Sequence, residues 1–412
     1  MSSLPDLPSE SPPPNRAAFE PLEEAMQAAL REIFPAAVLL IIWRGQTVLH
    51  KAYGYLDPET RRSPTRTDSL VDRASLTTLF TATAFMRQVD SGAAGLDTPV
   101  GEVLPEFTGE RRIGATEDPL LKVELPADAR YSGQVVNLGE VTFRHLLTHT
   151  SGLAAWRSLY LAGPPPDPAQ APHQLPPEAR RSRLAALFSS DFAYPPGARL
   201  VYSDLGFILL GEAIERIAAM DLERFFDQAI FRPLGLRRTC FNPLARGFST
   251  GEIAPSEVCA WRERRLLGEV DDENASGLGG VAGHAGLFST AEEVARLGMV
   301  YRNLGSHAGG QILAPQTAAE MTRQQAGLDG QRRGLAWVLW TSQSCSCGSL
   351  FGPGSYGHTG FTGTSLWIDP DRDLLVAALT NRVYHGREPD AIQGFRPRLH
   401  DLVVEGVERL EG

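Results

Sequence analysis

The chain has 412 residues, of which 42% are hydrophobic, 8% aromatic and 21% charged, and this composition excludes a disordered, collagenous or coiled-coil protein. The length predicts two or three domains, or one large domain with an insertion. Acidic residues (49) outnumber basic residues (39), so the formal charge of -10 disfavours nucleic acid and anionic membranes as partners. Lysine occurs at two positions, Lys51 and Lys122, which leaves few candidates for amine chemistry.

The N-terminal segment is polar and rich in Ser and Pro, and we expect residues 1–17 to form a disordered leader. It lacks the basic start and apolar run of a secretory signal. The longest apolar stretch, 36–43, is far shorter than the roughly 20 residues that span a bilayer. No zinc-type C-x-x-C spacing occurs, and we expect free thiols at Cys240, Cys259, Cys345 and Cys347. These features predict a cytoplasmic protein with no membrane partner.

The first structured segments are predicted to be a helix and a hairpin. Residues 19–34 have apolar side chains at helical spacing, with acidic residues early and a basic residue late. Residues 37–43 are apolar and β-branched, a turn follows at 44–46, and a second strand is predicted over 47–55. A sheet therefore begins near the N-terminus.

The middle of the chain is predicted to be mainly helical. Helical segments separated by loops fill residues 75–219 and include 76–92, 142–149 and 205–219. The proline-rich stretch 163–177 cannot continue a helix and is expected to be an exposed loop.

Strand patterns return near the C-terminus. Residues 364–368 and 374–380 read as two strands joined by a turn at 369–373, and residues 399–410 as a closing helix. Strands at both ends around a helical middle predict one sheet assembled from distant segments, with a helical lobe inserted into it.

Three short segments contain residues suited to nucleophilic catalysis: Ser75-Leu76-Thr77-Thr78, Tyr202-Ser203-Asp204 and His358-Thr359-Gly360. A serine at a helix start is often an N-cap. The same position also suits a nucleophile, because the free amides and the positive helix end stabilise a developing oxyanion.

The order and surroundings of these segments resemble the serine β-lactamase and penicillin-binding protein superfamily, specifically class C β-lactamase-like hydrolases and esterases. The strings that carry the resemblance include DRASLTTLFTATAFMRQVD, VTFRHLLTHTSGL, VYSDLGFILLGEAIERI, GGVAGHAGLFSTAEEVARL and GHTGFTGTSLWIDPDRDLLVAALTNR. The resemblance implies an α/β (α+β) fold of the β-lactamase/transpeptidase type, an antiparallel sheet flanked by terminal helices with an inserted all-helical lobe. It implies a single domain over 18–411, with a sheet lobe at about 18–70 and 285–411 and a helical lobe at about 71–284.

The resemblance also implies roles for the three segments. Ser75 would attack an ester or amide carbonyl and form an acyl-enzyme that water hydrolyses. Tyr202 would relay protons. The backbone amides of Ser75 and Phe361 would form the oxyanion hole, and Thr359 and Gly360 would align the substrate along an edge strand.

In the superfamily that the chain resembles, the first motif is Ser-x-x-Lys. In this chain the position of that lysine is occupied by Thr78. A threonine hydroxyl neither accepts a proton near neutral pH nor supplies a positive charge. Asp204 stands where many relatives have asparagine, and His358 where many have lysine. Lys51 in the first hairpin and Lys122 in an insertion are not obvious substitutes.

Two compensations are conceivable. Asp204 acts as the base, or Tyr202 works with His358 if this imidazole titrates near pH 7. Alternatively, Arg73 places a fixed positive charge in the site.

Other polar residues are weaker candidates. His145 and His149 have a spacing that can bind zinc, although a structural role is favoured. The group Asp271, Asp272, Glu273 and His284 resembles a metal cluster, but GGVAGHAGLFS reads better as a glycine-rich loop under the active site, in which His284 either packs or lines the pocket. Trp156 either sets specificity or lies in the core. Redox or metal roles for Cys345 and Cys347 lack a partner motif.

The leading hypothesis is a serine hydrolase that acts through Ser75 on an ester or amide, slowed or altered by Thr78, with no cofactor and no metal. Esterase or peptidase-like activity is favoured over cleavage of β-lactams. The alternative is a catalytically inactive relative that binds a ligand or partner in the same cleft, and a metal-dependent hydrolase is a third reading. The partner would be a small molecule, and the oligomeric state stays open.

Overall fold

The computed structural model describes residues 16–165, 167–328, 330–343 and 345–411. Most of the expected leader, residues 1–15, lies outside the described residues.

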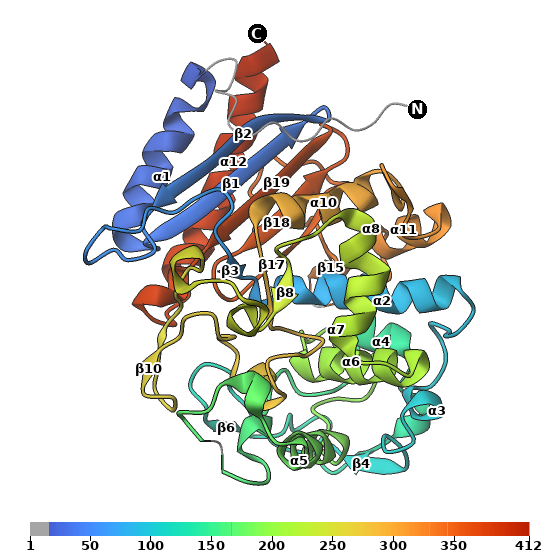
Figure 1. Cartoon of the computed structure of the whole chain (residues 1–412). Helices are drawn as coiled ribbons and strands as arrows, with labels where there is room; N and C mark the ends of the chain where they lie inside the picture. The colour runs from blue at the N-terminus through green and yellow to red at the C-terminus, as the bar shows by residue number, and fades with distance from the viewer. Residues whose placement is uncertain (1–15, 166, 329, 344, 412) are drawn as a thin grey trace.

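A large antiparallel sheet joins strands from the two ends of the chain (Figure 1). β1 pairs with β19 from Ala37 opposite Thr380 to Trp43 opposite Leu374, so the predicted sheet of distant segments is confirmed. In the described part of the chain this sheet has eight strands, in the spatial order β14 (Ala326–Leu328), β15 (Gln331–Arg333), β16 (Val338–Leu339), β17 (Tyr356–Thr359), β18 (Ser365–Asp369), β19 (Leu374–Thr380), β1 (Ala36–Trp43) and β2 (Gln46–Gly54).

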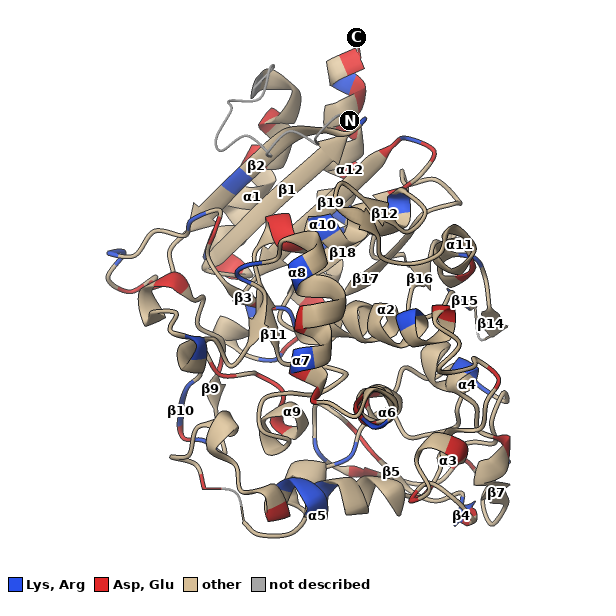
Figure 2. Cartoon of the chain, turned by 45° about the vertical axis from the view of Figure 1, so that its right-hand side comes forward, with Lys and Arg blue, Asp and Glu red and all other residues tan. Residues whose placement is uncertain are grey.

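Helices cover both faces of the sheet, which explains why β1 is apolar at every position. Ala37, Leu39 and Ile41 pack with α1 (Glu20–Glu32) and α12 (Asp390–Glu411). The alternate side chains, including Val38 and Leu40, pack toward α10 (Ala291–Arg302) and the helical part of the chain. A strand with two buried faces gains from hydrophobic residues on both. Figure 2 shows that charged residues lie mainly on loops and helices, away from β1 and β19.

The helical middle packs as a second layer beside the sheet. α2 lies against α6, and aromatic rings join neighbouring helices, with the Phe85 and Phe143 centroids 4.6 Å apart. Its helices are α2 (Thr77–Asp90), α3 (Val100–Val103), α4 (Phe143–Leu147), α5 (Pro177–Phe188), α6 (Asp204–Ala218), α7 (Leu222–Phe226), α8 (Arg232–Leu234) and α9 (Glu273–Gly277), and α11 (Pro315–Thr322) follows α10.

Short strands connect these layers. A small sheet with the order β3-β11-β8 lies where the helical part meets the large sheet. The bounds of the short strands are β3 (Val71–Asp72), β11 (Leu287–Ser289) and β8 (Cys240–Phe241), with pairs β4 (Glu110–Arg112) and β7 (Val135–Asn137), β5 (Thr116–Glu117) and β6 (Glu124–Leu125), β9 (Val258–Cys259) and β10 (Arg264–Arg265), and β12 (Ser306–His307) and β13 (Gly310–Gln311).

The closing helix is longer than predicted. It was expected over 399–410, whereas α12 begins at Asp390 and contains Pro397. Proline inside a helix removes a hydrogen bond and usually marks a boundary. Here Ile392 and Phe395, before the proline, are buried in the same core as Leu399, so packing offsets that cost. Among the described residues, no helix combines the length and the apolar character needed to cross a membrane.

Trp367 provides a test of the packing on β18. Its side chain is fully buried, and a Cβ at Gly357 on β17 would lie 2.3 Å from the Trp367 ring. We expect Trp367→Ala to lower the free energy of unfolding by about 3–5 kcal/mol, because it removes a large apolar surface and leaves a cavity. Val258→Ala, at a side chain that is 60% exposed, should cost less than about 0.5 kcal/mol. Urea denaturation measures both values, and equal losses would contradict this account of the core.

Candidate active site

Ser75 lies in a tight turn between β3 and α2. The 3-10 turn Ala74–Leu76 leads directly into α2, and Ala74 has a φ of 46°, in the left-handed region. Such a conformation is costly for a non-glycine residue. The Asp72 carboxylate accepts a hydrogen bond from the Ala74 amide at 2.8 Å, which stabilises the turn.

Two adjoining cavities share Ser75 and Tyr202. The first, of about 320 Å³, is lined by Trp156, Asp204 and several charged side chains. The second, of about 300 Å³, follows β17 and is lined by His358, Thr359, Gly360 and Phe361. The structure therefore brings the first, second and third sequence motifs together around one site.

Tyr202 is held by a buried histidine. The His149 ring lies 4.4 Å from the Tyr202 ring, and His149 Nδ1 accepts a hydrogen bond from the Ser203 amide at 3.1 Å. Burial and the Asp204 charge raise the pKa of Tyr202 far above its usual value, while the nearby Ser75 hydroxyl lowers it. The Tyr202 hydroxyl itself has no hydrogen-bond partner among the described residues. A neutral phenol can pass a proton along, but a stable phenolate base is excluded at neutral pH.

Thr78 lies one turn after Ser75 and is fully buried. Its hydroxyl donates a hydrogen bond to the Ser75 carbonyl oxygen at 2.7 Å. Such helical back-bonding satisfies the hydroxyl locally. Thr78 therefore adds neither a charge nor a free base to the cavity.

His358 is a neutral residue of β17. Its Nδ1 hydrogen bonds to the Thr359 carbonyl oxygen at 2.8 Å. Burial and the Arg333 charge lower the pKa of His358 to about 3. The conceivable partnership between Tyr202 and an imidazole that titrates near pH 7 is therefore wrong for His358.

Arg73 does not reach the site. Its guanidinium lies 4.0 Å from the Phe80 ring centroid and is fully buried. It lines neither cavity with Ser75. The conceivable rescue by an Arg73 charge inside the cavity is not supported by this placement.

Asp204 lies at the start of α6 beside Tyr202. Burial raises the pKa of Asp204 to about 7, the Asp272 charge adds to this, and the charges of His284 and Lys122 oppose it. A carboxyl group with such a pKa suits proton transfer near neutral pH. The role of Asp204 as a base stays a prediction.

The segment 271–273 and His284 lie in the first cavity, where they bond to different partners. Asp272 hydrogen bonds to His284 Nε2 at 2.8 Å, whereas Glu273 pairs with Arg387 at 2.7 Å and Asp271 accepts from the Ser256 hydroxyl. Among the described residues, no group of three or more His, Cys, Asp or Glu side chains is arranged to hold a metal ion. His284 is thus both packed under the site and part of the cavity lining, so both alternatives given for it from the sequence apply.

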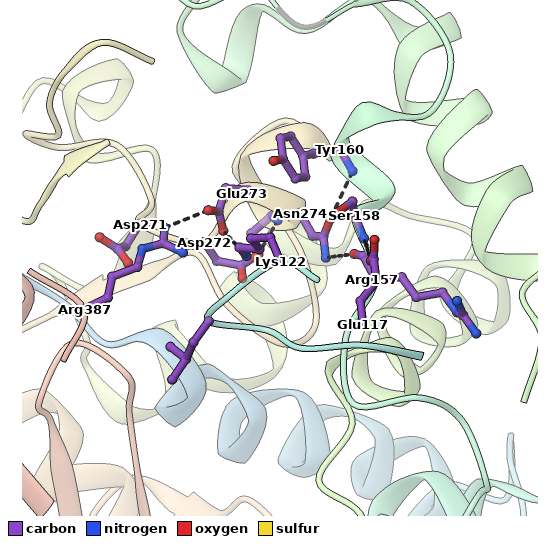
Figure 3. A network of polar contacts seen from close by, with 12 residues as sticks. Glu117, Lys122, Arg157, Ser158, Tyr160, Asp271, Asp272, Glu273, Asn274 and Arg387 are labelled. Carbon is purple, nitrogen blue, oxygen red and sulfur yellow. Dashed lines mark hydrogen bonds and ion pairs between the residues drawn. The ribbon is translucent and has the colours of Figure 1, made fainter. Parts of the chain in front are cut away.

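Lys122 is the cavity residue that the sequence reasoning set aside. The β5/β6 hairpin carries it to the first cavity, where its Nζ lies 3.4 Å from the Trp156 ring centroid and 3.5 Å from a Glu273 oxygen. Figure 3 shows Glu273 between Arg387 and Lys122. No motif signals this contact, because it depends on how an irregular insertion folds back.

The remaining candidates have structural contacts. His145 Nδ1 accepts from the Thr142 amide at 3.2 Å and caps α4, which agrees with a structural role. Trp156 is 3% exposed and still lines the cavity, so it is both core and wall. Cys345 and Cys347 are free thiols with sulfur atoms 2.6 Å apart, and they lie outside both cavities.

Comparison with known proteins identifies the family. A family model described as Beta-lactamase matches residues 19–395. The chain belongs to the beta-lactamase family. A curated relative from Salmonella agona (strain SL483), named "Putative D-alanyl-D-alanine carboxypeptidase", is 30% identical over 373 residues, which cover 85% of this chain and 79% of that protein.

Solved structures confirm the β-lactamase/transpeptidase-like fold of this beta-lactamase-family protein. "EstCE1, a hydrolase with promiscuous acyltransferase activity" aligns with a TM-score of 0.65 at 23% identity and covers 92% of this chain and 98% of that one. The octameric penicillin-binding protein homologue from Pyrococcus abyssi aligns with a TM-score of 0.64 at 21% identity, over 93% of this chain and 76% of that one. The family and its curated relatives indicate a serine hydrolase.

Gly360 tests how closely β17 must approach the Ser75 turn. A Cβ at this position would lie 2.1 Å from the Thr364 hydroxyl and 2.5 Å from the Arg73 carbonyl oxygen. Gly360→Ala should displace the adjacent Phe361 amide and slow the modification of Ser75 by a fluorophosphonate about 100-fold, as for loss of an oxyanion donor. Gly394→Ala on α12, where a Cβ meets nothing within 4 Å, is the matched control. Mass spectrometry follows the labelling. Equal labelling rates for the two variants would refute the requirement for a close approach of β17 to the Ser75 turn.

Proposed function

We propose that the protein is a class C β-lactamase-like serine hydrolase that cleaves an ester or amide through an acyl-enzyme on Ser75. The observation that supports this most is the convergence of Ser75, Tyr202 and the His358–Phe361 segment on one continuous site. In this proposal the Ser75 oxygen attacks the carbonyl carbon, and the amides of Ser75 and Phe361 hold the oxyanion. Thr359 and Gly360 align the substrate. The leaving group departs, and water then hydrolyses the acyl-enzyme.

Asp204 is the proposed base, with Tyr202 as the relay. Tyr202 lines both cavities together with Ser75 and lines the first together with Asp204, which supports a path between them. Two linked transfers, from Ser75 to Tyr202 and from Tyr202 to Asp204, avoid a free phenolate. The replacement of the motif lysine by Thr78 leaves a weaker charge environment at Ser75, and we therefore propose slow turnover.

The proposed substrate is a small molecule that carries a negative charge beside its scissile bond. Arg333 lines the second cavity, is buried, and leaves its Nε and Nη1 without a hydrogen-bond partner among the described residues. A buried guanidinium with unpartnered N–H groups favours a nearby anionic group such as a carboxylate. A free carboxylate is also what a D-alanyl-D-alanine carboxypeptidase, the name of the curated relative, would meet on its substrate. Esterase or peptidase-like cleavage is preferred over β-lactam cleavage.

The second candidate function is ligand binding in a catalytically inactive cleft. The observation that favours it is Thr78, whose buried hydroxyl bonds to the Ser75 carbonyl and supplies no base. For either function we propose a cytoplasmic setting without nucleic-acid or membrane partners, supported by the formal charge of -10 and the free thiols.

The primary test compares the wild type with Ser75→Ala and Thr78→Lys. We expect the wild type to hydrolyse p-nitrophenyl acetate and butyrate slowly and to form one fluorophosphonate adduct on Ser75, while Ser75→Ala does neither. Thr78→Lys should accelerate hydrolysis, because it restores a cation beside the nucleophile. The double variant Ser75→Ala/Thr78→Lys is the control, since any gain must disappear in it. A wild type that neither turns over nor labels, beside an active Thr78→Lys, would refute the hydrolase function and favour the binding alternative.

Arg333→Gln tests the preference for an anionic substrate. We expect the ratio of kcat/KM for p-nitrophenyl hemisuccinate to that for p-nitrophenyl acetate to fall roughly tenfold or more, because a hydrogen-bonded charge pair is lost. Steady-state kinetics on both esters give this ratio, and the ratio cancels any general damage to the site. An unchanged ratio would refute the role of Arg333 in recognising the carboxylate.

A further inference from the structure

His284 is a buried imidazole next to the proposed proton path. It is 1% exposed and lines the first cavity together with Ser75, Tyr202 and Asp204. Its Nδ1 atom is buried and has no hydrogen-bond partner among the described residues.

The loop that carries His284 has little freedom to move. It runs from α9 to β11, and the Gly283 carbonyl accepts a hydrogen bond from the Thr81 hydroxyl on α2 at 2.6 Å. On its other side, a Cβ at Gly283 would lie 2.1 Å from the Phe207 carbonyl oxygen on α6. The backbone that carries His284 is thus fixed against the two helices that carry the Ser75 and Asp204 motifs.

His284 and Asp272 form a charge pair. His284 Nε2 lies 2.8 Å from Asp272 Oδ1, and the same oxygen accepts the Ala275 amide at 2.7 Å. Burial opposes ionisation of both groups, but the His284 charge and these hydrogen bonds hold the pKa of Asp272 at about 2. Burial likewise works against the imidazolium, but the charge and hydrogen bond of Asp272, with the Asp204 charge, raise the pKa of His284 above its usual value.

The charged groups that act on Asp204 come from several elements. Burial raises the pKa of Asp204 most and the Asp272 charge raises it further, whereas the charges of His284 and Lys122 lower it. Of the two cations, His284 has the larger effect. The Lys122 ammonium group also pairs with Glu273 and lies over the Trp156 ring, so Asp204 is not its main partner.

We propose that protonated His284, held by Asp272, is a positioning residue. It supplies beside Asp204 a positive charge that a lysine at the position of Thr78 would otherwise provide. The inference rests on the proposed function. When the Ser75 oxygen bonds to the carbonyl carbon, its proton passes to Tyr202 and the Tyr202 proton passes to Asp204, while the carbonyl electron pair moves to the oxyanion. The proton returns along the same path to the leaving group as its bond breaks. His284 keeps its own proton throughout.

The first test measures the His284 titration by NMR on the full chain with ¹³C-labelled histidine. The His284 signal among the 9 histidines is assigned by its loss in His284→Gln. We expect a pKa above 6.5 in the wild type and a lower pKa in Asp272→Asn, since the paired carboxylate is removed. A His284 signal that titrates below 6.5 in the wild type, or that is unchanged in Asp272→Asn, would overturn the charge pair.

The second test measures the rate of Ser75 labelling by a fluorophosphonate against pH. In His284→Gln we expect the acidic limb to move up by about one pH unit, with labelling recovered at higher pH, because Asp204 ionises less readily. Lys122→Met, which removes the other cation, should move the limb less. A purely structural role would lower the whole profile without moving its limb and would overturn the proposal. Absence of wild-type labelling at every pH would instead refute the hydrolase function, and the NMR titration still decides the charge pair.

Discussion

The site depends on a seam between two segments that lie about 290 positions apart in the sequence. The Thr362 hydroxyl donates to the Asp72 carbonyl at 2.7 Å, and the Thr364 hydroxyl donates to the Arg73 carbonyl at 3.0 Å. These bonds join the turn before Ser75 to the turn after β17. Because the sheet and the helical part meet here, small shifts in either layer would separate Ser75 from Phe361. Ala74, in the turn before Ser75, has a left-handed backbone conformation. Such strained residues occur where the surrounding structure holds a functional geometry in place.

The first cavity gathers several buried charged groups around Asp204. A carboxylate inside a protein is costly unless an opposite charge and hydrogen bonds accompany it. The His284 imidazole bonds to Asp272, and its charge also acts on Asp204, so one cation serves two carboxyl groups. The Thr78 hydroxyl, which donates a hydrogen bond to the Ser75 carbonyl oxygen, adds no charge to this group. Burial is the main reason that the pKa of Asp204 is raised, and it raises the pKa of Asp271 in the same cavity as well.

The sequence predicted those features that local pattern controls. The apolar, β-branched run 37–43 predicted a strand, and the three motifs predicted which segments meet. Features that depend on long-range packing were not predictable. Lys122 reaches the cavity through an insertion without periodicity, and the neutral state of His358 follows from burial beside Arg333. The closing helix was predicted from residue 399, whereas α12 begins at Asp390, because the burial of the residues around Pro397 outweighs the local cost of a proline.

The two cavities differ in charge, and Ser75 lies between them. The first contains Asp204, Asp271, Asp272 and Glu273, partly balanced by Lys122, His284 and Arg387. The described residues that line the second include Arg333, Arg382 and Arg396 and no acidic side chain. A substrate that bridges both cavities is therefore oriented by the field itself, with an anionic group on the β17 side and a neutral or cationic group near Asp204. Such an orientation places the negative end of the substrate away from the base, where it does not raise the pKa of Asp204 further. The charges around Ser75 thus come from several distant segments of the chain.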